Sequence, residues 1–200
     1  PPRSTLFPYT TLFRSGFEVD LGPDGDLECT YGYLAGTDIE RRQQLTDALT
    51  NPKYKGILCA RGGYGATRLL EDFAWPFMAA GAQALQYGQA IAPKWLIGFS
   101  DITALLWSLA NQGIASVHGP VLTTLPEESD DTRHRLFALV QGQSLPPLMG
   151  NGWGGGRVIG RLFPGNLAVA THLLGTRHCP NLTDARSEER RVGKECRSRW

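Results

Sequence analysis

Residues 95–103 read Trp-Leu-Ile-Gly-Phe-Ser-Asp-Ile-Thr, an apolar run that passes through Gly-x-Ser-Asp directly into a helical pattern. A short apolar run that leads into a helix in this way predicts a buried strand followed by a sharp turn. A serine at such a turn projects from the carboxyl edge of a sheet, as in a nucleophile elbow. Ser100 is therefore a candidate nucleophile, and the Asp101 N–H is a candidate donor to an oxyanion.

The same residues also have a purely structural interpretation, in which Ser100 is a helix N-cap and Asp101 is a first-turn acid. Ile102 stands where the esterase elbow has its second glycine. For that reason the local pattern, taken alone, favours the N-cap interpretation.

Two further strands are predicted around this stretch. Residues 55–60 form a short apolar run before a glycine turn, and a helical pattern with inward Leu69, Leu70 and Phe73 follows over 66–73. Residues 114–117 form a third apolar run, which ends at His118. The repeated order of strand, turn and helix predicts an α/β fold, with a parallel sheet flanked by helices.

A helix is also predicted before the first of these strands. Thr37 and Glu40 have the spacing of a capping box. The apolar stripe of this helix consists of Ile39, Leu45, Ala48 and Leu49, and Asn51-Pro52 ends it.

The glycine turn Arg61-Gly-Gly-Tyr-Gly65 follows one strand and precedes one helix. Its Gly62 or Gly63 N–H could supply a second oxyanion donor opposite Ser100. Arg61 could bind a substrate carboxylate in a bidentate way, and Tyr64 could line the pocket. Two alternatives stay open here: a cradle for a small anion in a non-enzymatic binding module, and a turn that only connects strand to helix.

Composition limits the class of protein. The chain has 200 residues, 42% hydrophobic residues and a formal net charge of +1. These values exclude wholesale disorder and argue against nucleic acid as a partner. No apolar run is long enough to predict a membrane span. The cysteines show neither zinc-site spacing nor a disulfide framework, which favours a cytoplasmic protein without a metal.

The two ends of the chain differ from its middle. Residues 1–15 and 187–200 resemble translated sequencing-adapter read-through, and we expect them to be artefactual tails. We expect residues 16–120 to form an α/β domain that carries the candidate nucleophile. Residues 121–186 are expected to contain a helix over 127–140, a glycine-rich excursion, a second helix over 167–174 and the start of a linker.

Four motifs together resemble the serine LD-carboxypeptidases. They are Tyr33-Leu-Ala-Gly-Thr-Asp38, Ala60-Arg-Gly-Gly-Tyr-Gly-Ala-Thr-Arg-Leu-Leu70, Ile97-Gly-Phe-Ser-Asp-Ile-Thr103 and His118-Gly-Pro120. This family comprises murein tetrapeptide carboxypeptidases and the related microcin-immunity peptidases. The motifs occur in the family's order, and on this resemblance the nucleophile interpretation of Ser100 replaces the N-cap interpretation.

The resemblance implies a hydrolase that cleaves a terminal D-amino acid, typically D-Ala, from an L,D-peptide bond through an acyl-enzyme on Ser100. It implies oxyanion donors at Asp101 and Gly63, with Gly62 as a further donor, and substrate contacts at Arg61, Tyr64, His118 and Asn166. No cofactor or metal is implied. A muropeptide is the expected partner, and members of this family are often homodimers. A microcin-immunity enzyme would instead act on a peptidyl-nucleotide.

The chain also departs from the family pattern. The family's catalytic Glu and His lie in a C-terminal half whose motifs are absent here, and residues 1–15 stand in place of the first strand. We therefore expect a fragment, truncated at both ends, that is inactive by itself because a serine without its base is a weak nucleophile. Pro164 replaces a glycine of the family's Gly-Gly-Asn-Leu motif, which removes one backbone N–H.

Overall fold

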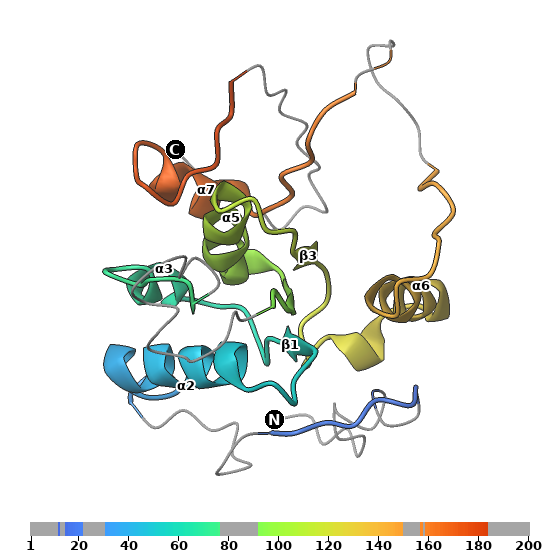
Figure 1. Cartoon of the computed structure of the whole chain (residues 1–200), viewed down its shortest axis with the longest axis horizontal. Coiled ribbons are helices and arrows are strands. Elements are labelled where there is room, and N and C mark those ends of the chain that lie inside the picture. The colour runs from blue at the N-terminus through green and yellow to red at the C-terminus, as the bar shows by residue number, and fades with distance from the viewer. Residues whose placement is uncertain are drawn as a thin grey trace.

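A computed structural model describes residues 12, 15–21, 31–76, 92–149, 157 and 159–183 of the chain. Within these residues, strands β1 (Gly56–Leu58), β2 (Trp95–Gly98) and β3 (Val117–His118) form one parallel sheet in the order β1-β2-β3. Helices lie on both sides of the sheet (Figure 1). The predicted α/β fold is confirmed.

The helices alternate with the strands along the chain. Short 3-10 turns, η2 and η3, precede two of them. The bounds are α2 Asp38–Thr50, α3 Ala66–Leu69, η2 Ser100–Ile102, α5 Thr103–Asn111, η3 Leu125–Glu127, α6 Asp130–Val140 and α7 Leu167–Leu173. Each parallel strand pair is joined by a crossover that contains a helix, as parallel pairing requires.

Helix α2 begins with the predicted capping box. The Thr37 hydroxyl accepts from the Glu40 N–H, and the Glu40 carboxylate accepts from the Thr37 N–H at 2.7 Å. The helix ends at Thr50 with Asn51 as its C-cap, as predicted. The assignment of Ile39 to the inward stripe was wrong, because this side chain is 76% exposed while Leu49 is fully buried.

Helix α3 is shorter than the sequence predicted. It ends at Leu69, and Asp72 adopts a left-handed φ of 54°, which a continuing helix does not permit. Leu69 and Leu70 are buried as predicted. Phe73 lies beyond the helix and packs its ring edge-on against Trp75 at 5.0 Å.

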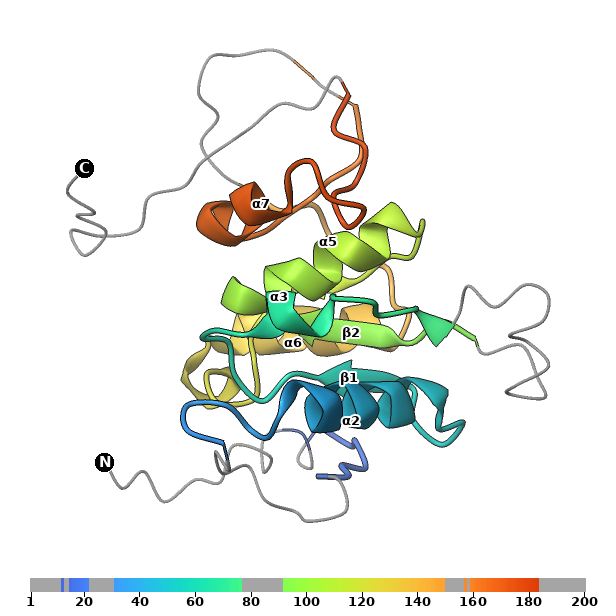
Figure 2. The ribbon, with the colours of Figure 1, turned by 90° about the vertical axis from the view of Figure 1, so that its left-hand side faces the viewer.

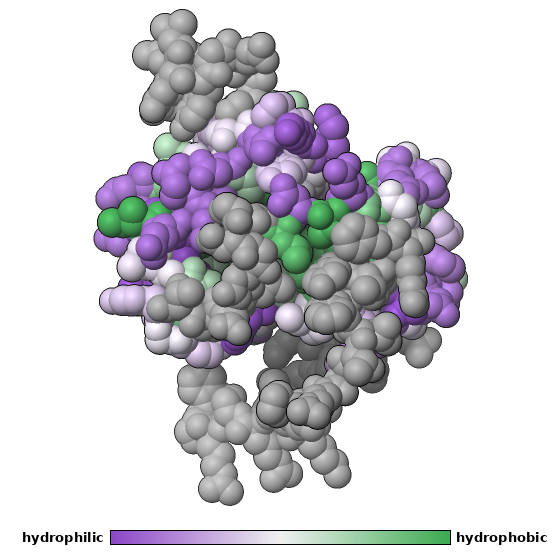
Figure 3. Space-filling model, turned by 90° about the horizontal axis from the view of Figure 1, so that it is seen from below, coloured by the Kyte–Doolittle hydropathy of each residue, from purple (hydrophilic) through white to green (hydrophobic). Residues whose placement is uncertain are grey.

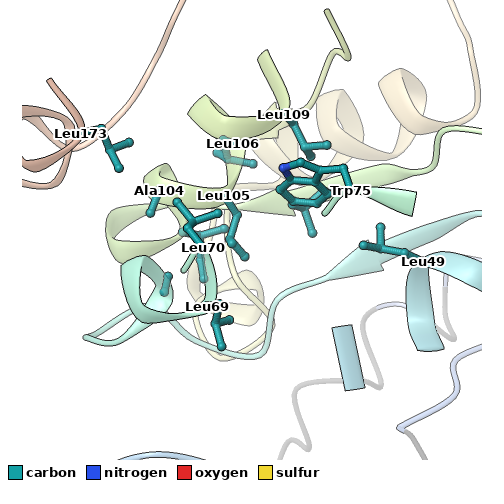
Figure 4. Close-up of a cluster of buried hydrophobic side chains, with 12 residues drawn as sticks. Leu49, Leu69, Leu70, Trp75, Ala104, Leu105, Leu106, Leu109 and Leu173 are labelled. Atoms are coloured by element: carbon teal, nitrogen blue, oxygen red, sulfur yellow. The ribbon is translucent and has the colours of Figure 1, made fainter. Parts of the chain in front are cut away.

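Alternate residues of β2 divide the core between the two faces of the sheet. Leu96 joins a cluster with α2, α3, α5 and Leu173 of α7, and many of its side chains are shown in Figure 4. Ile97 faces the other way, toward Val117 and α6. Figure 2 accordingly shows α3 and α5 on one side of β2 and α6 behind it. Successive side chains of a strand point to opposite faces, so a continuously apolar strand is buried on both.

The region after residue 120 agrees partly with the prediction. A helix was expected over 127–140, but Glu128 is extended and Ser129 caps a helix that starts at Asp130. Helix α7 ends at Leu173, close to the predicted boundary. Residues 150–156 and 158 of the glycine-rich excursion lie outside the described residues, as do 1–11, 13, 14 and 184–200 of the two ends. Leu12 packs against the cluster around Ile97.

The carboxyl edge of the sheet is bordered by the chain that follows β3. The Leu122 N–H donates to the Cys59 carbonyl at 2.9 Å, and the Thr123 N–H donates to the Ala60 carbonyl at 3.0 Å. Residues 121–123 therefore lie beside the chain that leads from β1 into the glycine turn.

The surface seen from below is largely hydrophilic over its described residues, with a hydrophobic strip near its middle (Figure 3). Among the helices in the described part of the chain, none has the length and apolar composition of a membrane span.

Candidate active site

Ser100 stands at the turn between β2 and α5 with a left-handed φ of 60°. Serine seldom adopts this conformation because it costs free energy, so the surrounding structure must enforce it. Residues strained in this way are common at functional sites. Ser100 is only partly buried. The 3-10 turn η2 begins at Ser100, its N-cap residue is Phe99, and neither η2 nor α5 has a side-chain cap, so the Ser100 hydroxyl does not serve as an N-cap.

The turn is tight because Gly98 has no side chain. A Cβ on Gly98 would lie 2.8 Å from Cγ2 of Ile102, closer than real Cβ contacts allow. Ile102 occupies the place of the second elbow glycine and packs over the first. A strand that turns this sharply into a helix, with a strained serine at its apex, is the geometry of a nucleophile elbow.

The glycine turn at residues 61–65 lies directly against Ser100. A Cβ on Gly62 would be 2.9 Å from the Ser100 Cβ and 3.4 Å from its Oγ. Among the described residues, neither the Gly62 N–H nor the Gly63 N–H donates to a backbone or side-chain acceptor. The structure thus packs Gly62 against Ser100, whereas the atoms nearest to Gly63 belong to Tyr33 and Arg61. The catalytic roles of Ser100, Asp101, Gly62 and Gly63 stay predictions.

The Arg61 side chain is held by an aromatic residue that the sequence reasoning did not single out. Its guanidinium donates to the Tyr33 hydroxyl at 2.7 Å and lies 5.0 Å from the centre of the Tyr33 ring. The stack and the hydrogen bond orient Arg61 while leaving it exposed to solvent. Tyr64 is 62% exposed, as a residue that lines an open pocket can be.

His118 lies in β3, and Asn166 lies at the start of α7. His118 follows Val117 in β3, opposite Gly98, and lines a hollow of about 270 Å³ with Trp107 and Phe163. Its ring retains solvent contact, and partial desolvation lowers the pKa of His118 below 6.5. The Asn166 side chain caps α7, and its N–H donates to the Thr103 hydroxyl at 2.8 Å. Their substrate contacts remain predictions.

Cys59 packs against the core near β1, and burial raises the pKa of its thiol to about 12. A thiol with such a pKa is protonated at neutral pH and is a poor nucleophile. The described residues contain no cluster of three or more His, Cys, Asp or Glu side chains that could hold a metal ion.

Residues 6–119 match the family model of the LD-carboxypeptidase N-terminal domain. The chain belongs to the LD-carboxypeptidase family. It is 53% identical over 151 residues to a Synechocystis protein assigned by name to the carboxypeptidases, covering 76% of this chain and 46% of that protein. It is 34% identical over 171 residues to the murein tetrapeptide carboxypeptidase of Pseudomonas aeruginosa, covering 79% of this chain and 52% of the enzyme.

A solved LD-carboxypeptidase has the same fold. The muramoyltetrapeptide carboxypeptidase of Oxalobacter formigenes superposes with a TM-score of 0.64 at 27% identity, over 90% of this chain and 58% of that enzyme. The chain spans about half the length of the curated relatives it matches. The resemblance found in the sequence is therefore confirmed as family membership.

Within this LD-carboxypeptidase domain, two contacts escaped the sequence reasoning. One is the pair of Arg61 and Tyr33. The other joins the Asp101 carboxylate to the Ala66 N–H at 2.8 Å. The motifs contain all four residues, but the pairs are separated by 28 and 35 positions, and only tertiary packing brings their members together.

Proposed function

We propose that this chain carries the nucleophile-bearing half of a serine hydrolase that removes a terminal D-amino acid from murein tetrapeptides. Ser100 is the nucleophile, and the Asp101, Gly62 and Gly63 N–H groups receive the oxyanion. The observation that carries the proposal is the strained φ of Ser100 at a strand-to-helix turn, with Gly62 packed against its Cβ. Family membership supports the reaction class.

In this reaction the Ser100 Oγ attacks the carbonyl carbon of the L,D-peptide bond and gives its proton to a general base. The carbonyl oxygen becomes an oxyanion between the backbone N–H groups, where preorganised donors stabilise charge as it develops. The C–N bond then breaks, the D-amino acid leaves with a proton returned by the base, and water hydrolyses the ester of Ser100.

The base and its orienting carboxylate are proposed to be the His and Glu of the C-terminal half of the family member. In the described residues no histidine is recorded in contact with Ser100: His172 bonds the Ala168 carbonyl and His178 bonds Ser108. On this proposal the 200-residue chain alone is inactive, and the complete enzyme acts on its peptide in the cytoplasm.

The test compares the full-length enzyme with its Ser100→Ala variant, using a murein tetrapeptide and measuring released D-Ala. We expect the variant to lose release by at least about 10³-fold, the scale on which a nucleophile contributes, with unchanged thermal unfolding. Release by the variant at the wild-type rate would refute the assignment of Ser100.

The same assay settles the substrate class. A peptidyl-nucleotide analogue is offered in parallel with the tetrapeptide, and preferential cleavage of the analogue would replace the murein substrate with that of a microcin-immunity enzyme. Tight nucleotide binding that depends on Gly62 and Gly63, without cleavage of either compound, would instead support an anion-binding module.

A further inference from the structure

The side chain of Asp101 has a task separate from that of its backbone. Its carboxylate is buried, with Asp101 only 7% exposed, and Oδ2 accepts from the Ala66 N–H at 2.8 Å. Ala66 is the first residue of α3 and follows the glycine turn directly. The bond therefore ties the turn after β1 to the turn after β2.

This tie determines how the two sets of oxyanion donors are placed relative to each other. The Asp101 N–H belongs to the elbow, whereas the Gly62 and Gly63 N–H groups belong to the glycine turn. Upstream, the turn leaves β1; downstream, it is held by the Ala66 bond and by Arg41, which donates to the Gly65 carbonyl at 3.3 Å. Without the Asp101 acceptor, one of these downstream restraints on the glycine turn is lost.

We propose that the Asp101 carboxylate is a positioning residue, which holds the Arg61–Gly65 turn in register with Ser100 so that the donors of both turns converge on one oxyanion. This inference rests on the proposed function. A bond between a carboxylate and a backbone N–H is charge-assisted and stronger than a neutral one. Figure 2 shows α3 beside the start of α5, and the Asp101 carboxylate links the two turns through its bond to Ala66.

A simpler interpretation is that Asp101 only stabilises the first turn of α3. The two interpretations differ in what a variant does to catalysis. If Asp101 only stabilises, its loss lowers the unfolding temperature and leaves kcat of the folded enzyme unchanged. If it positions the donors, kcat falls and KM changes little, because the donors act on the transition state more than on the bound substrate.

The experiment uses the full-length enzyme with three variants. Asp101→Ala removes the acceptor, and Asp101→Asn keeps an oxygen that can accept from Ala66. Arg42→Ala is the matched control: Arg42 also holds α3, donating to the Arg68 carbonyl at 2.9 Å, and it has no hydrogen bond to the glycine turn or the elbow among the described residues. We expect Asp101→Ala to lower kcat about 100-fold, the cost of a displacement near 1 Å, with less than about a threefold change in KM.

Asp101→Asn is expected to recover most of that loss, and Arg42→Ala is expected to retain the wild-type kcat while unfolding at a lower temperature. Equal kcat in Asp101→Ala and wild type would overturn the proposal, as would equal loss in Asp101→Ala and Asp101→Asn when both are folded. If Asp101→Ala does not fold, the kcat of Asp101→Asn is compared with that of Ser100→Ala. A kcat for Asp101→Asn as low as that of Ser100→Ala would then overturn the proposal.

A second readout does not need activity. Hydrogen exchange of the Ala66 amide in the 200-residue chain is expected to accelerate at least about tenfold in Asp101→Ala, and much less in Asp101→Asn, because the amide loses its acceptor. Unchanged exchange in Asp101→Ala would overturn the link itself. A wild-type enzyme that releases no D-Ala, combined with the expected exchange result, would overturn the proposed function and its catalytic consequence while leaving the link in place.

Discussion

At the scale of single residues, the site depends on how closely two backbones approach. Gly62 packs against Ser100, and Gly98 packs against Ile102; neither position has room for a side chain. A strained serine persists only where its surroundings enforce the conformation. Small residues at these two positions therefore allow the elbow and the glycine turn to meet.

Replacing Gly62 with alanine should separate these turns. The new Cβ would lie 2.9 Å from the Ser100 Cβ and 3.3 Å from the Phe99 carbonyl oxygen, so one backbone must move. We expect a loss of stability of about 1–3 kcal/mol from overpacking, together with a lower kcat for D-Ala release. Chemical denaturation and the release assay measure both.

Gly160→Ala is the matched control for Gly62→Ala, because a Cβ on Gly160 would meet nothing within 4 Å. Wild-type stability and activity in Gly62→Ala would show that the turns are not as close as the structure places them.

The pair of Arg61 and Tyr33 makes a separate prediction about substrate binding. Tyr33→Phe keeps the stacked ring but removes the oxygen that accepts from the Arg61 guanidinium. If Arg61 binds the substrate carboxylate, KM should rise by about 3- to 10-fold, corresponding to one hydrogen bond of roughly 0.5–1.5 kcal/mol, with kcat nearly unchanged. Steady-state kinetics on the tetrapeptide measures this.

Tyr31→Phe serves as the control for Tyr33→Phe, because Tyr31 is comparably exposed and no contact with Arg61 is recorded for it. A KM that rises equally in both variants would argue against a specific role for the pair.

At the scale of elements, the predictions held where local chemistry determines a boundary. The capping box starts α2 at the expected residue, because Thr37 and Glu40 satisfy each other's N–H groups whatever the tertiary structure does. Helix α3 was overestimated because its apolar spacing continues past Leu69, whereas the backbone turns at Asp72. The packing of buried Leu70 and partly buried Phe73 against the core requires contact with other elements, not continuation of the helix.

The capping box predicts a pH-dependent contribution to stability. The hydrogen bond from the Thr37 N–H, followed by that from its hydroxyl, lowers the pKa of Glu40 below 4.5. The folded state therefore binds this proton less readily than the unfolded state. The contribution is present above pH 4.5 and is lost as the pH falls through the folded pKa.

Thr37→Ala should lower the unfolding free energy at pH 7 by about 1 kcal/mol. Glu40→Gln can keep the box but not the charge, so it should weaken the pH dependence between pH 5 and pH 3, relative to wild type, in thermal unfolding scans at about unit intervals. An identical pH dependence in Glu40→Gln and wild type would contradict the assignment to Glu40.

At the scale of the whole molecule, a partly buried chain of hydrogen bonds connects the segment after α7 to the core. The Trp75 indole donates to the Ser108 hydroxyl at 2.8 Å, and that hydroxyl lies 2.9 Å from Nδ1 of His178. Trp75, Ser108 and His178 come from three regions of the chain. Their hydrogen bonds satisfy polar groups that would otherwise be costly in the interior.

Ser108→Ala should destabilise the protein by about 1–3 kcal/mol, because the buried indole N–H loses its acceptor. Denaturant unfolding followed by tryptophan fluorescence measures the loss. Ser116→Ala, in the loop before β3, is the control and should remain near wild type. A Ser108→Ala protein as stable as this control would show that the polar chain contributes nothing.

The same contact predicts sensitivity to mild acid. Burial, and then the charge of Arg177, lower the pKa of His178 below 6.5. The unfolded state therefore takes up this proton first, so stability falls as the pH decreases from 6.5 toward the folded pKa. We expect His178→Asn to reduce the slope of stability between pH 7.5 and pH 5.5, measured by thermal unfolding. A slope unchanged from wild type would assign the effect to other groups, such as His118, whose pKa is also lowered.

The sequence by itself determined the class of fold and the family. Apolar runs bounded by glycine turns predict buried strands whatever surrounds them, and four ordered motifs carry the resemblance that family membership confirmed. The sequence also placed the candidate nucleophile at the turn after β2, because the pattern changes from strand to helix over consecutive residues.

Only the tertiary structure decided which of these residues meet. The contact of Gly62 with Ser100, the bond from Ala66 to Asp101 and the stack of Arg61 on Tyr33 each join positions at least 28 apart. Such pairs depend on the register of the parallel strands and on which side of the sheet each helix packs. Those choices are made by burial of the whole core, so no local pattern in the chain contains them.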